Sequence, residues 1–174
     1  MDNAMVDSET LGVRPGSILL SLGATMFCPK TGQLGVDFYV NIDTQSCRDV
    51  GLTEDQSTVD WWKGQSKEAR AILLPDRVPL REALERFSIW WINATAQFFW
   101  SNGAAFDAVL LESAYRACGM EPPWQFWNVR CCRTILALGN RKPDRKGLIP
   151  HYSLHDAQSQ ARAVAATLRT GIKL

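Results

Sequence analysis

The sequence has little of what most catalytic classes require. It contains only two histidines, and it has no G-x-S-x-G elbow, no P-loop and no G-x-G-x-x-G fingerprint. These absences remove the usual sequence support for a serine hydrolase, an NTPase or a dinucleotide-dependent enzyme. His151 and His155 are four residues apart, but no glutamate completes an H-E-x-x-H arrangement. Zinc-dependent hydrolysis is therefore disfavoured.

The sequence also lacks a long uninterrupted apolar run. The most apolar stretches, near residues 17–28 and 87–100, contain polar residues and fall short of the roughly 20 residues that span a bilayer. The amino terminus has no basic region followed by an apolar segment, as a secretion signal would have. Five cysteines, an odd number without C-x-x-C spacing, suit a reducing compartment. We therefore expect a cytoplasmic protein that does not associate with membranes and whose cysteines are core thiols.

The length and composition indicate one α/β domain over residues 1–174, since 46% of the residues are hydrophobic and no repeat or linker interrupts the chain. Apolar periodicity and turn residues predict strands first, and then helices that alternate with single strands. This order favours a mixed sheet flanked by helices. The predicted strands are 3–10, 17–28, 35–42 and 97–100, and the predicted helices are 53–74 in one or two pieces, 79–94, 104–118, the first part of 124–138, and 154–168.

Two acidic side chains stand close together near the end of the first predicted strand. Asp7 and Glu9 are two residues apart, so they project from the same face. Two carboxylates about 4 Å apart repel each other by roughly 4 kcal/mol at an effective dielectric constant of 20. A divalent cation such as Mg²⁺ or Mn²⁺ would relieve this repulsion, because hard cations prefer carboxylate oxygen. Alone, the pair is also compatible with an exposed strand end.

Two further aspartates lie near predicted helix starts, where an acid also has a structural explanation. Asp107 falls in the first turn of a helix, where it interacts favourably with the helix dipole. Asp156 falls three residues after Ser153, which predicts a capping box with Ser153 as the N-cap. This capping places His151 before the helix, in a loop free to reach a metal site, and leaves His155 on the helix surface.

Three segments together resemble the motifs of DEDDh 3′–5′ exonucleases, in order and with plausible separations. They are Asp7-x-Glu9-Thr10, Asn102-x-x-x-x-Asp107 and His151-x-x-x-x-Asp156. The resemblance implies an RNase H-like α/β fold, with a mixed sheet of about five strands flanked by helices. It implies that Asp7, Glu9, Asp107 and Asp156 hold two Mg²⁺ or Mn²⁺ ions and that His151 is the general base. The reaction would release nucleoside 5′-monophosphates from the 3′ end.

A narrower resemblance covers most of residues 5–165. Val59-Asp-Trp-Trp62, Gln65-Ser66-x-Glu68-Ala-Arg70 and Val129-Arg-Cys-Cys-Arg133-Thr are similar to segments of the RNase AS group of exoribonucleases. This resemblance implies single-stranded RNA as the substrate, with a preference for adenylate. It also implies a homodimer in which the partner helps to complete the site.

The same resemblances suggest residues that bind the substrate. Thr10 and Leu11 follow the first motif, where family members hold the terminal nucleotide. Trp61 and Trp62 could stack on bases, but adjacent helical residues point about 100° apart, so one of the two should pack inside. Gln65 and Arg70 are candidates for contacts with substrate or partner, or are helix-surface residues. Other aromatic residues are expected in the core or at a dimer interface, namely Trp90, Trp91, Phe98, Phe99 and Trp100.

One segment is strongly basic although the net charge of the chain is only +1. Between residues 130 and 146, Asp144 is the only acid among six cations: Arg130, Arg133, Arg141, Lys142, Arg145 and Lys146. Such a patch can follow a phosphate backbone, and it can equally be a solvated loop.

Two alternatives to an exoribonuclease stay open at this level. The acidic motifs do not distinguish ribose from deoxyribose, so a DNA-specific exonuclease of the same fold is the first. A catalytically idle RNase H-like module that binds nucleic acid or protein is the second. The sequence disfavours it, because a binding module gains nothing from carboxylates that repel each other without a metal.

Overall fold

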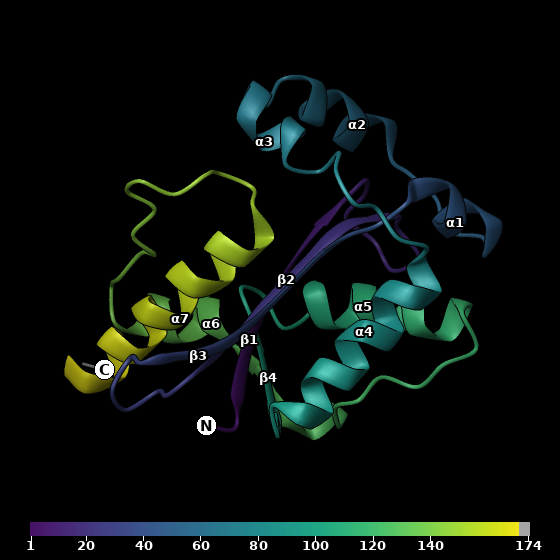
Figure 1. Ribbon diagram of the computed structural model, residues 1–174. Coiled ribbons are helices and arrows are strands. Elements are labelled where there is room, and N and C mark those ends of the chain that lie inside the picture. Colours follow the sequence, from purple (N-terminus) through teal and green to yellow (C-terminus); the bar gives the residue numbers. More distant parts are fainter. Residues whose placement is uncertain (171–174) are drawn as a thin grey trace.

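The computed structural model describes residues 1–170 as a five-stranded mixed sheet covered by helices on both faces (Figure 1). The strand order is β3-β2-β1-β4-β5, in which β1, β2 and β3 form an antiparallel meander and β4 and β5 run parallel to β1. The strands are β1 (Asn3–Thr10), β2 (Leu19–Phe27), β3 (Leu34–Asn41), β4 (Phe98–Ser101) and β5 (Val129–Cys131).

The helices form two layers and one outlying group. Helices α6 and α7 lie on one face of the sheet, α4 and α5 lie on the other, and α1, α2 and α3 gather beyond its end (Figure 1). The helices are α1 (Thr44–Asp49), α2 (Gln56–Lys63), α3 (Lys67–Ala71), α4 (Leu80–Asn93), α5 (Asp107–Ala117), the 3₁₀ helix η1 (Phe126–Asn128), α6 (Cys132–Leu138) and α7 (Ser153–Thr170). No helix within residues 1–170 is long and apolar enough to cross a membrane.

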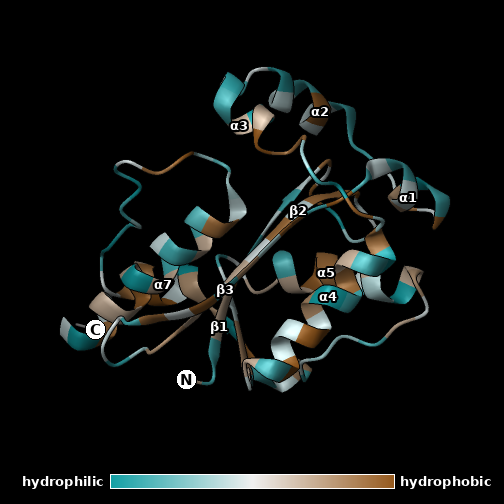
Figure 2. Ribbon diagram, in the orientation of Figure 1, coloured by the Kyte–Doolittle hydropathy of each residue, from teal (hydrophilic) through white to brown (hydrophobic). Residues whose placement is uncertain are grey.

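Each face of the sheet has its own hydrophobic core. On the α4 and α5 side, Phe87, Trp91 and Phe99 pack together, and on the α6 and α7 side, Met5 and Trp100 pack against the helices. Figure 2 shows hydrophobic residues along the central strands and on the helix faces that turn toward them. The sheet is therefore held from both sides, as expected for strands that are apolar on both faces.

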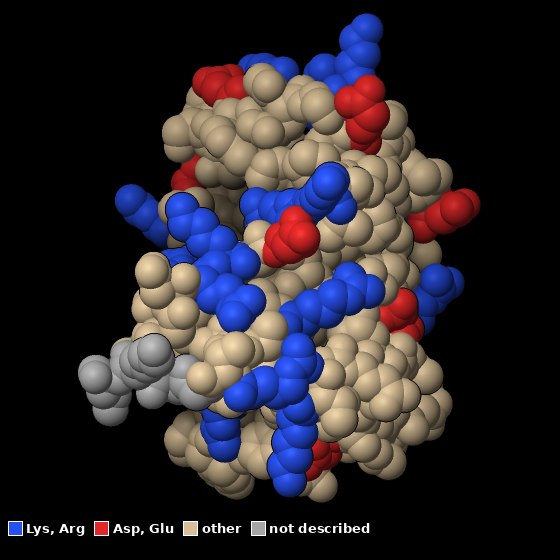
Figure 3. Space-filling model, turned by 90° about the vertical axis from the view of Figure 1, so that its left-hand side faces the viewer, with Lys and Arg blue, Asp and Glu red and all other residues tan. Residues whose placement is uncertain are grey.

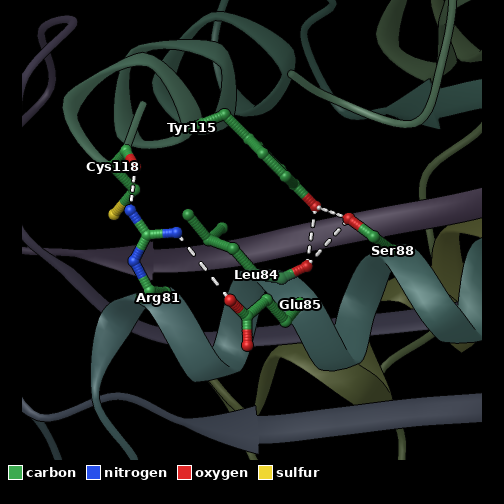
Figure 4. A network of polar contacts seen from close by, with 6 residues as sticks. All are labelled: Arg81, Leu84, Glu85, Ser88, Tyr115 and Cys118. Carbon is green, nitrogen blue, oxygen red and sulfur yellow. Dashed lines mark hydrogen bonds and ion pairs between the residues drawn. The ribbon is translucent and has the colours of Figure 1, made fainter. Parts of the chain in front are cut away.

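A polar network locks α5 against α4 (Figure 4). The Tyr115 hydroxyl donates a hydrogen bond to the Leu84 carbonyl at 3.0 Å and shares another with the Ser88 hydroxyl at 2.8 Å. Arg81 adds a hydrogen bond to the Cys118 carbonyl at the end of α5. Because Tyr115 is fully buried, these bonds fix the position of α5, which begins at Asp107.

The structure corrects part of the predicted element order. Residues 124–138, predicted as a helix followed by a short segment, instead form η1, then the edge strand β5, and then α6. A three-residue strand has too few positions for a period-2 pattern, so the sequence could not reveal it. The short helix α1 was also missed. Residues 53–74 do form two short helices, α2 and α3. Cys28 and Cys131 are only partly buried, unlike the other three cysteines.

A glycine lets the start of α7 lie directly on the sheet beside β1. Gly23 on β2 pairs with Asp7 on β1, and a Cβ atom at Gly23 would stand 2.3 Å from the backbone nitrogen of Leu154. No side chain fits in this space, because its nearest neighbours are backbone atoms. The first turn of α7 therefore depends on Gly23 for its position next to Asp7.

Replacing Gly23 with alanine should push α7 away from the sheet and lower the free energy of unfolding by about 1–3 kcal/mol, the usual cost of overpacking. Urea denaturation measures this change. Gly64→Ala is the matched control, because its Cβ would meet only the Trp61 carbonyl oxygen at 3.4 Å and the backbone there is right-handed. Equal stability of both variants would contradict this account of the close approach.

Candidate active site

Strand β1 supplies two carboxylates to a cleft at the end of the sheet. Asp7 and Glu9 face α7, and the Asp7 carboxylate accepts a hydrogen bond of 2.8 Å from the Gln160 side chain of that helix. Ser8, between them, turns toward α5 instead, as strand alternation requires. The end of β1 therefore contacts the helices on both faces of the sheet.

The third carboxylate reaches the same cleft from the opposite face. Asp107 is the first residue of α5, and its carboxylate accepts hydrogen bonds from the Ser8 backbone nitrogen at 3.0 Å and the Ser8 hydroxyl at 2.8 Å. Burial raises the pKa of Asp107 to about 6, although the hydrogen bonds from Ser8 act in the lowering direction. Ser8 thus links the carboxylate of α5 to the strand that carries the first two.

The fourth carboxylate and the histidine lie at the start of α7. Asp156 is buried in the first turn, and His151 precedes the helix with φ at 58°. This left-handed conformation is strained for a residue other than glycine, and such strain often marks functional sites. The predicted N-cap is wrong, because α7 begins at Ser153 itself, whose hydroxyl is 3.1 Å from the Ser21 hydroxyl on β2. His151 nevertheless lies outside the helix, as expected.

The aromatic pair of α2 packs against His151. The rings of Trp61 and Trp62 meet the imidazole edge-on, with ring centroids 4.9 and 5.8 Å from it. Trp62 is buried and donates a hydrogen bond of 2.8 Å to the Thr10 carbonyl, whereas Trp61 is 46% exposed. One tryptophan therefore packs and the other remains open to solvent, as the 100° helical spacing predicts.

The four carboxylates and His151 line one cleft of about 190 Å³. Burial raises the pKa of Asp7 well above its usual value, and the charges of Asp107 and Asp156 raise it further. Burial also raises the pKa of Glu9, again with contributions from the neighbouring carboxylates. The ionised carboxylates are thus mutually destabilising unless positive charge is present.

The donor atoms in this cleft suit divalent metal ions. Oxygen and nitrogen ligand atoms of Glu9, His151 and Asp156 lie within 4.8 Å of one another, and Asp7 and Asp107 line the same cleft. The buried Gln160 amide is further support, because its oxygen has no hydrogen-bond partner within residues 1–170. Carboxylate-rich sites of this kind favour Mg²⁺ or Mn²⁺, since hard cations prefer oxygen ligands.

A second cleft, of about 390 Å³, adjoins the first. The two share Ser8, Glu9 and Phe106, and the second is also lined by Thr10, Trp61 and Trp62. Its mixed aromatic and polar walls suit a nucleoside, because aromatic faces stack on bases. Three of the six predicted substrate-binding residues therefore face this space.

The other three predicted substrate-binding residues line neither cleft. Leu11 packs against the core, the Gln65 amide donates a hydrogen bond to the Trp61 carbonyl, and Arg70 lies on the exposed side of α3. His155 accepts a hydrogen bond from the Ile149 backbone nitrogen at 3.2 Å, so it anchors the preceding loop.

Three residues that contact the carboxylates were not among the predicted site residues, namely Ser8, Arg145 and Gln160. Gln160 lies four residues after Asp156, which places both on one face of α7, and this spacing could have revealed it. Ser8 lies between two predicted site residues but points away from them. Arg145 comes from the basic segment, and its guanidinium is 2.7 Å from the Asp156 carboxylate. No local pattern predicts that contact, since it depends on how the loop before α7 folds back.

Comparison with known proteins identifies a family and a distant relative. A family model described as the 3′-5′ exoribonuclease Rv2179c-like domain matches residues 2–168. The chain is also 24% identical to an exodeoxyribonuclease of Enterobacteria phage T4, over 100% of this chain and 92% of that protein.

Solved structures share the fold at low sequence identity. The nuclease domain of 3'hExo, a DEDDh family member bound to rAMP, matches with a TM-score of 0.65 and 12% identity, over 99% of this chain and 94% of the other. Exonuclease X in complex with 5′-overhanging duplex DNA matches with a TM-score of 0.63 and 12% identity, over the same shares. The expected RNase H-like mixed sheet flanked by helices is therefore confirmed.

Arg145 should compete with metal ions for the cleft, because its positive charge already lies against Asp156. Arg145→Gln should tighten Mn²⁺ binding about fivefold, since a half-exposed ion pair is worth up to roughly 1 kcal/mol. The same variant should have a lower melting temperature in EDTA, because the carboxylates lose a counterion. Calorimetric titration and thermal unfolding measure the two effects.

Arg145→Lys keeps the charge and serves as the control, with metal affinity close to wild type. If Arg145→Gln bound Mn²⁺ no more tightly than this control, the proposed competition would be wrong.

Proposed function

Because the chain belongs to the family of 3′-5′ exoribonuclease Rv2179c-like domains, we propose that it shortens single-stranded RNA from the 3′ end and releases nucleoside 5′-monophosphates. Its 3′–5′ exonuclease class of the DEDDh type follows from the family and the fold. The observation that carries the proposal is the convergence of four carboxylates and His151 in one cleft from segments far apart in the sequence. We propose that residues 1–174 form a single domain with this activity.

Asp7, Glu9, Asp107 and Asp156 would hold two divalent cations, Mg²⁺ or Mn²⁺. When bound, such ions stabilise negative charge on the attacking and leaving oxygens of an in-line displacement. The chain's own contribution is to hold the carboxylates in place. Ser8 fixes Asp107, and Gln160 fixes Asp7 through its amide nitrogen.

His151 would accept the proton of the attacking water. Burial lowers the pKa of His151, so the imidazole is neutral and able to accept a proton near physiological pH. The rings of Trp61 and Trp62 restrict its movement from one side. As the bond from phosphorus to the 3′-oxygen breaks, the new P–O bond leaves a nucleoside 5′-monophosphate, and the shortened strand keeps a 3′-hydroxyl.

The cleft beside the carboxylates would hold the 3′-terminal nucleoside. Trp61 is the exposed member of the aromatic pair and can stack on the base for about 1–3 kcal/mol. Glu9 lines both this cleft and the carboxylate cleft, and the neighbouring Thr10 lines this one, so both are suited to contact the terminal sugar. A tightly held terminal nucleoside would place the adjoining phosphate over the carboxylates.

We also propose that the protein is a homodimer and that it is located in the cytoplasm. The homodimer rests on the resemblance to the RNase AS group, since the aromatic surplus that also suggested it is mostly core. Trp91, Phe99 and Trp100 are buried. Phe126 and Trp127 are the large aromatic side chains most exposed within residues 1–170, at 75% and 61%, so we propose them as candidates for a subunit contact.

Removal of two metal ligands should abolish the exonuclease activity. The double variant Asp7→Ala, Glu9→Ala should cleave a 5′-labelled strand at least about a hundredfold more slowly than wild type in Mg²⁺, because the metal site loses half of its carboxylates. A ladder that shortens from the 3′ end is the readout. Asp49→Ala, on the exposed end of α1, is the control. Should wild type and double variant be equally inactive on RNA and DNA, the chain is an idle module.

The sugar preference separates the proposal from its nearest alternative. DNA exonuclease activity is favoured by the named activity of the phage T4 relative, whereas the family description favours RNA. When matched RNA and DNA strands compete in one mixture, we expect the RNA to be cleaved faster. The terminal ribose can donate and accept hydrogen bonds through its 2′-hydroxyl, which deoxyribose lacks. Time courses of the two labels give the ratio. Faster cleavage of DNA by more than about tenfold, or 1.4 kcal/mol, would reverse the assignment.

A further inference from the structure

A third cleft, lined by basic residues, lies along α7 beyond the carboxylates. It has a volume of about 350 Å³, and four cations line it: Arg141, Lys142, Lys146 and Arg162. We call this the basic cleft. Figure 3 shows the face that carries α7 and the preceding loop, with Lys and Arg side chains gathered across it and few acidic side chains between them.

The four cations are available for a ligand. None of their side chains forms an ion pair with an acid within residues 1–170. Asp144 is the one acid in the lining, and its carboxylate accepts a hydrogen bond of 2.9 Å from the Lys146 backbone nitrogen. Four cations against one acid make this a strongly positive part of a chain whose net charge is +1.

The loop that carries three of these cations is tied to α7, so the cleft is preformed. The Ser159 hydroxyl donates a hydrogen bond of 2.7 Å to the Asp144 carbonyl, and the Ile149 nitrogen donates one to His155. The helix side of the cleft consists of small residues, Ser159, Ala163 and Ala166, together with Arg162. This leaves room for a sugar and a phosphate between cations.

The basic cleft and the carboxylate cleft are lined by the same helix and the same loop, although they share no lining residue. Asp156 and Arg162 lie on the same helix, six residues apart, which is about 9 Å along its axis and about 120° around it. Arg145 joins the two clefts, because it belongs to the basic loop and contacts Asp156. A strand whose 3′ end is held beside Trp61 would cross the carboxylates and then pass over Arg145 and around α7 to reach the basic cleft.

We propose that the basic cleft binds the backbone phosphates of the RNA strand upstream of the scissile bond. This inference rests on the proposed exonuclease function and adds a site that determines how long strands are held. Nucleic acid fits better than a membrane surface, because an amphipathic membrane-binding surface carries large apolar side chains beside its cations, and apart from Leu148 the cleft has small residues there.

The test compares two pairs of substitutions that remove the same charge. Arg141→Gln with Arg162→Gln empties the basic cleft of two cations whose side chains form no hydrogen bond or ion pair within the described residues. Arg86→Gln with Arg116→Gln removes two exposed cations from α4 and α5, on the opposite face of the sheet, and Arg86 is the one of these that pairs with an acid, Glu82, on the surface of α4. Fluorescence anisotropy in EDTA measures the affinity of the full chain for a labelled RNA of about 12 nucleotides, and hydrolysis of a dinucleotide in Mg²⁺ measures the carboxylate cleft alone.

We expect the basic-cleft pair to bind the long strand about tenfold more weakly than wild type. The slope of log affinity against log salt should fall by about 1.4, which is roughly 0.7 for each phosphate that the protein no longer neutralises. Dinucleotide hydrolysis should be unchanged, because a dinucleotide has no upstream phosphate. The control pair should match wild type in both measurements.

Equal loss of affinity in both pairs would attribute the effect to net charge and overturn the proposal, as would no loss in either. If the basic-cleft pair lost binding to anionic lipid vesicles but kept its affinity for RNA, the cleft would bind a membrane surface. That result would overturn the proposal as well. If the wild-type protein hydrolysed neither the long RNA nor the dinucleotide, the exonuclease function would be contradicted. The anisotropy measurement would still show whether the basic cleft binds RNA.

Discussion

The carboxylates in one small cleft are desolvated and repel one another, and the surrounding fold must hold them there despite this unfavourable energy. Burial raises the pKa values of Asp7, Glu9 and Asp107, so the ionised forms are unfavourable without a counterion. The fold holds the carboxylates there with Ser8 and Gln160, and Arg145 supplies a partial positive charge. Divalent cations would supply much more, which is why a costly arrangement can be retained at this place.

The two-sided packing of the sheet makes this convergence possible. Helix α5 approaches β1 from one face and α7 from the other, and each is fixed independently of the cleft. The network around Tyr115 holds α5, and the close approach of Leu154 to Gly23 holds α7. Because β1 lies in the middle of the sheet, side chains of both helices meet at its end. The core on each face therefore stabilises a carboxylate position that is itself electrostatically unfavourable.

The surroundings of the carboxylates differ on their two sides, and this difference gives the site a direction. One side is aromatic and partly apolar, with Trp61 exposed over the adjoining cleft. The other is basic and lies along α7, where Arg162 and the loop before the helix gather positive charge. Bases stack on aromatic faces, whereas phosphates are attracted to cations. A single strand with its 3′ end beside Trp61 would stack its terminal base on the aromatic side and place its upstream phosphates near the cations of the basic side.

The amino-acid sequence alone is enough to predict the order of most elements and, through the resemblance of three short motifs, the family, because motifs, strand alternation and helix spacing are local properties. The same resemblance predicts that four carboxylates and His151 meet, and they do line one cleft. The sequence also indicates that only one of Trp61 and Trp62 can face outward. Three features emerge only when the chain is folded: Arg145 contacts Asp156, Leu11 packs in the core, and β5 forms the sheet edge. These depend on which surfaces meet after folding, since a loop that folds back on a helix and a three-residue edge strand leave no periodic signal in the chain.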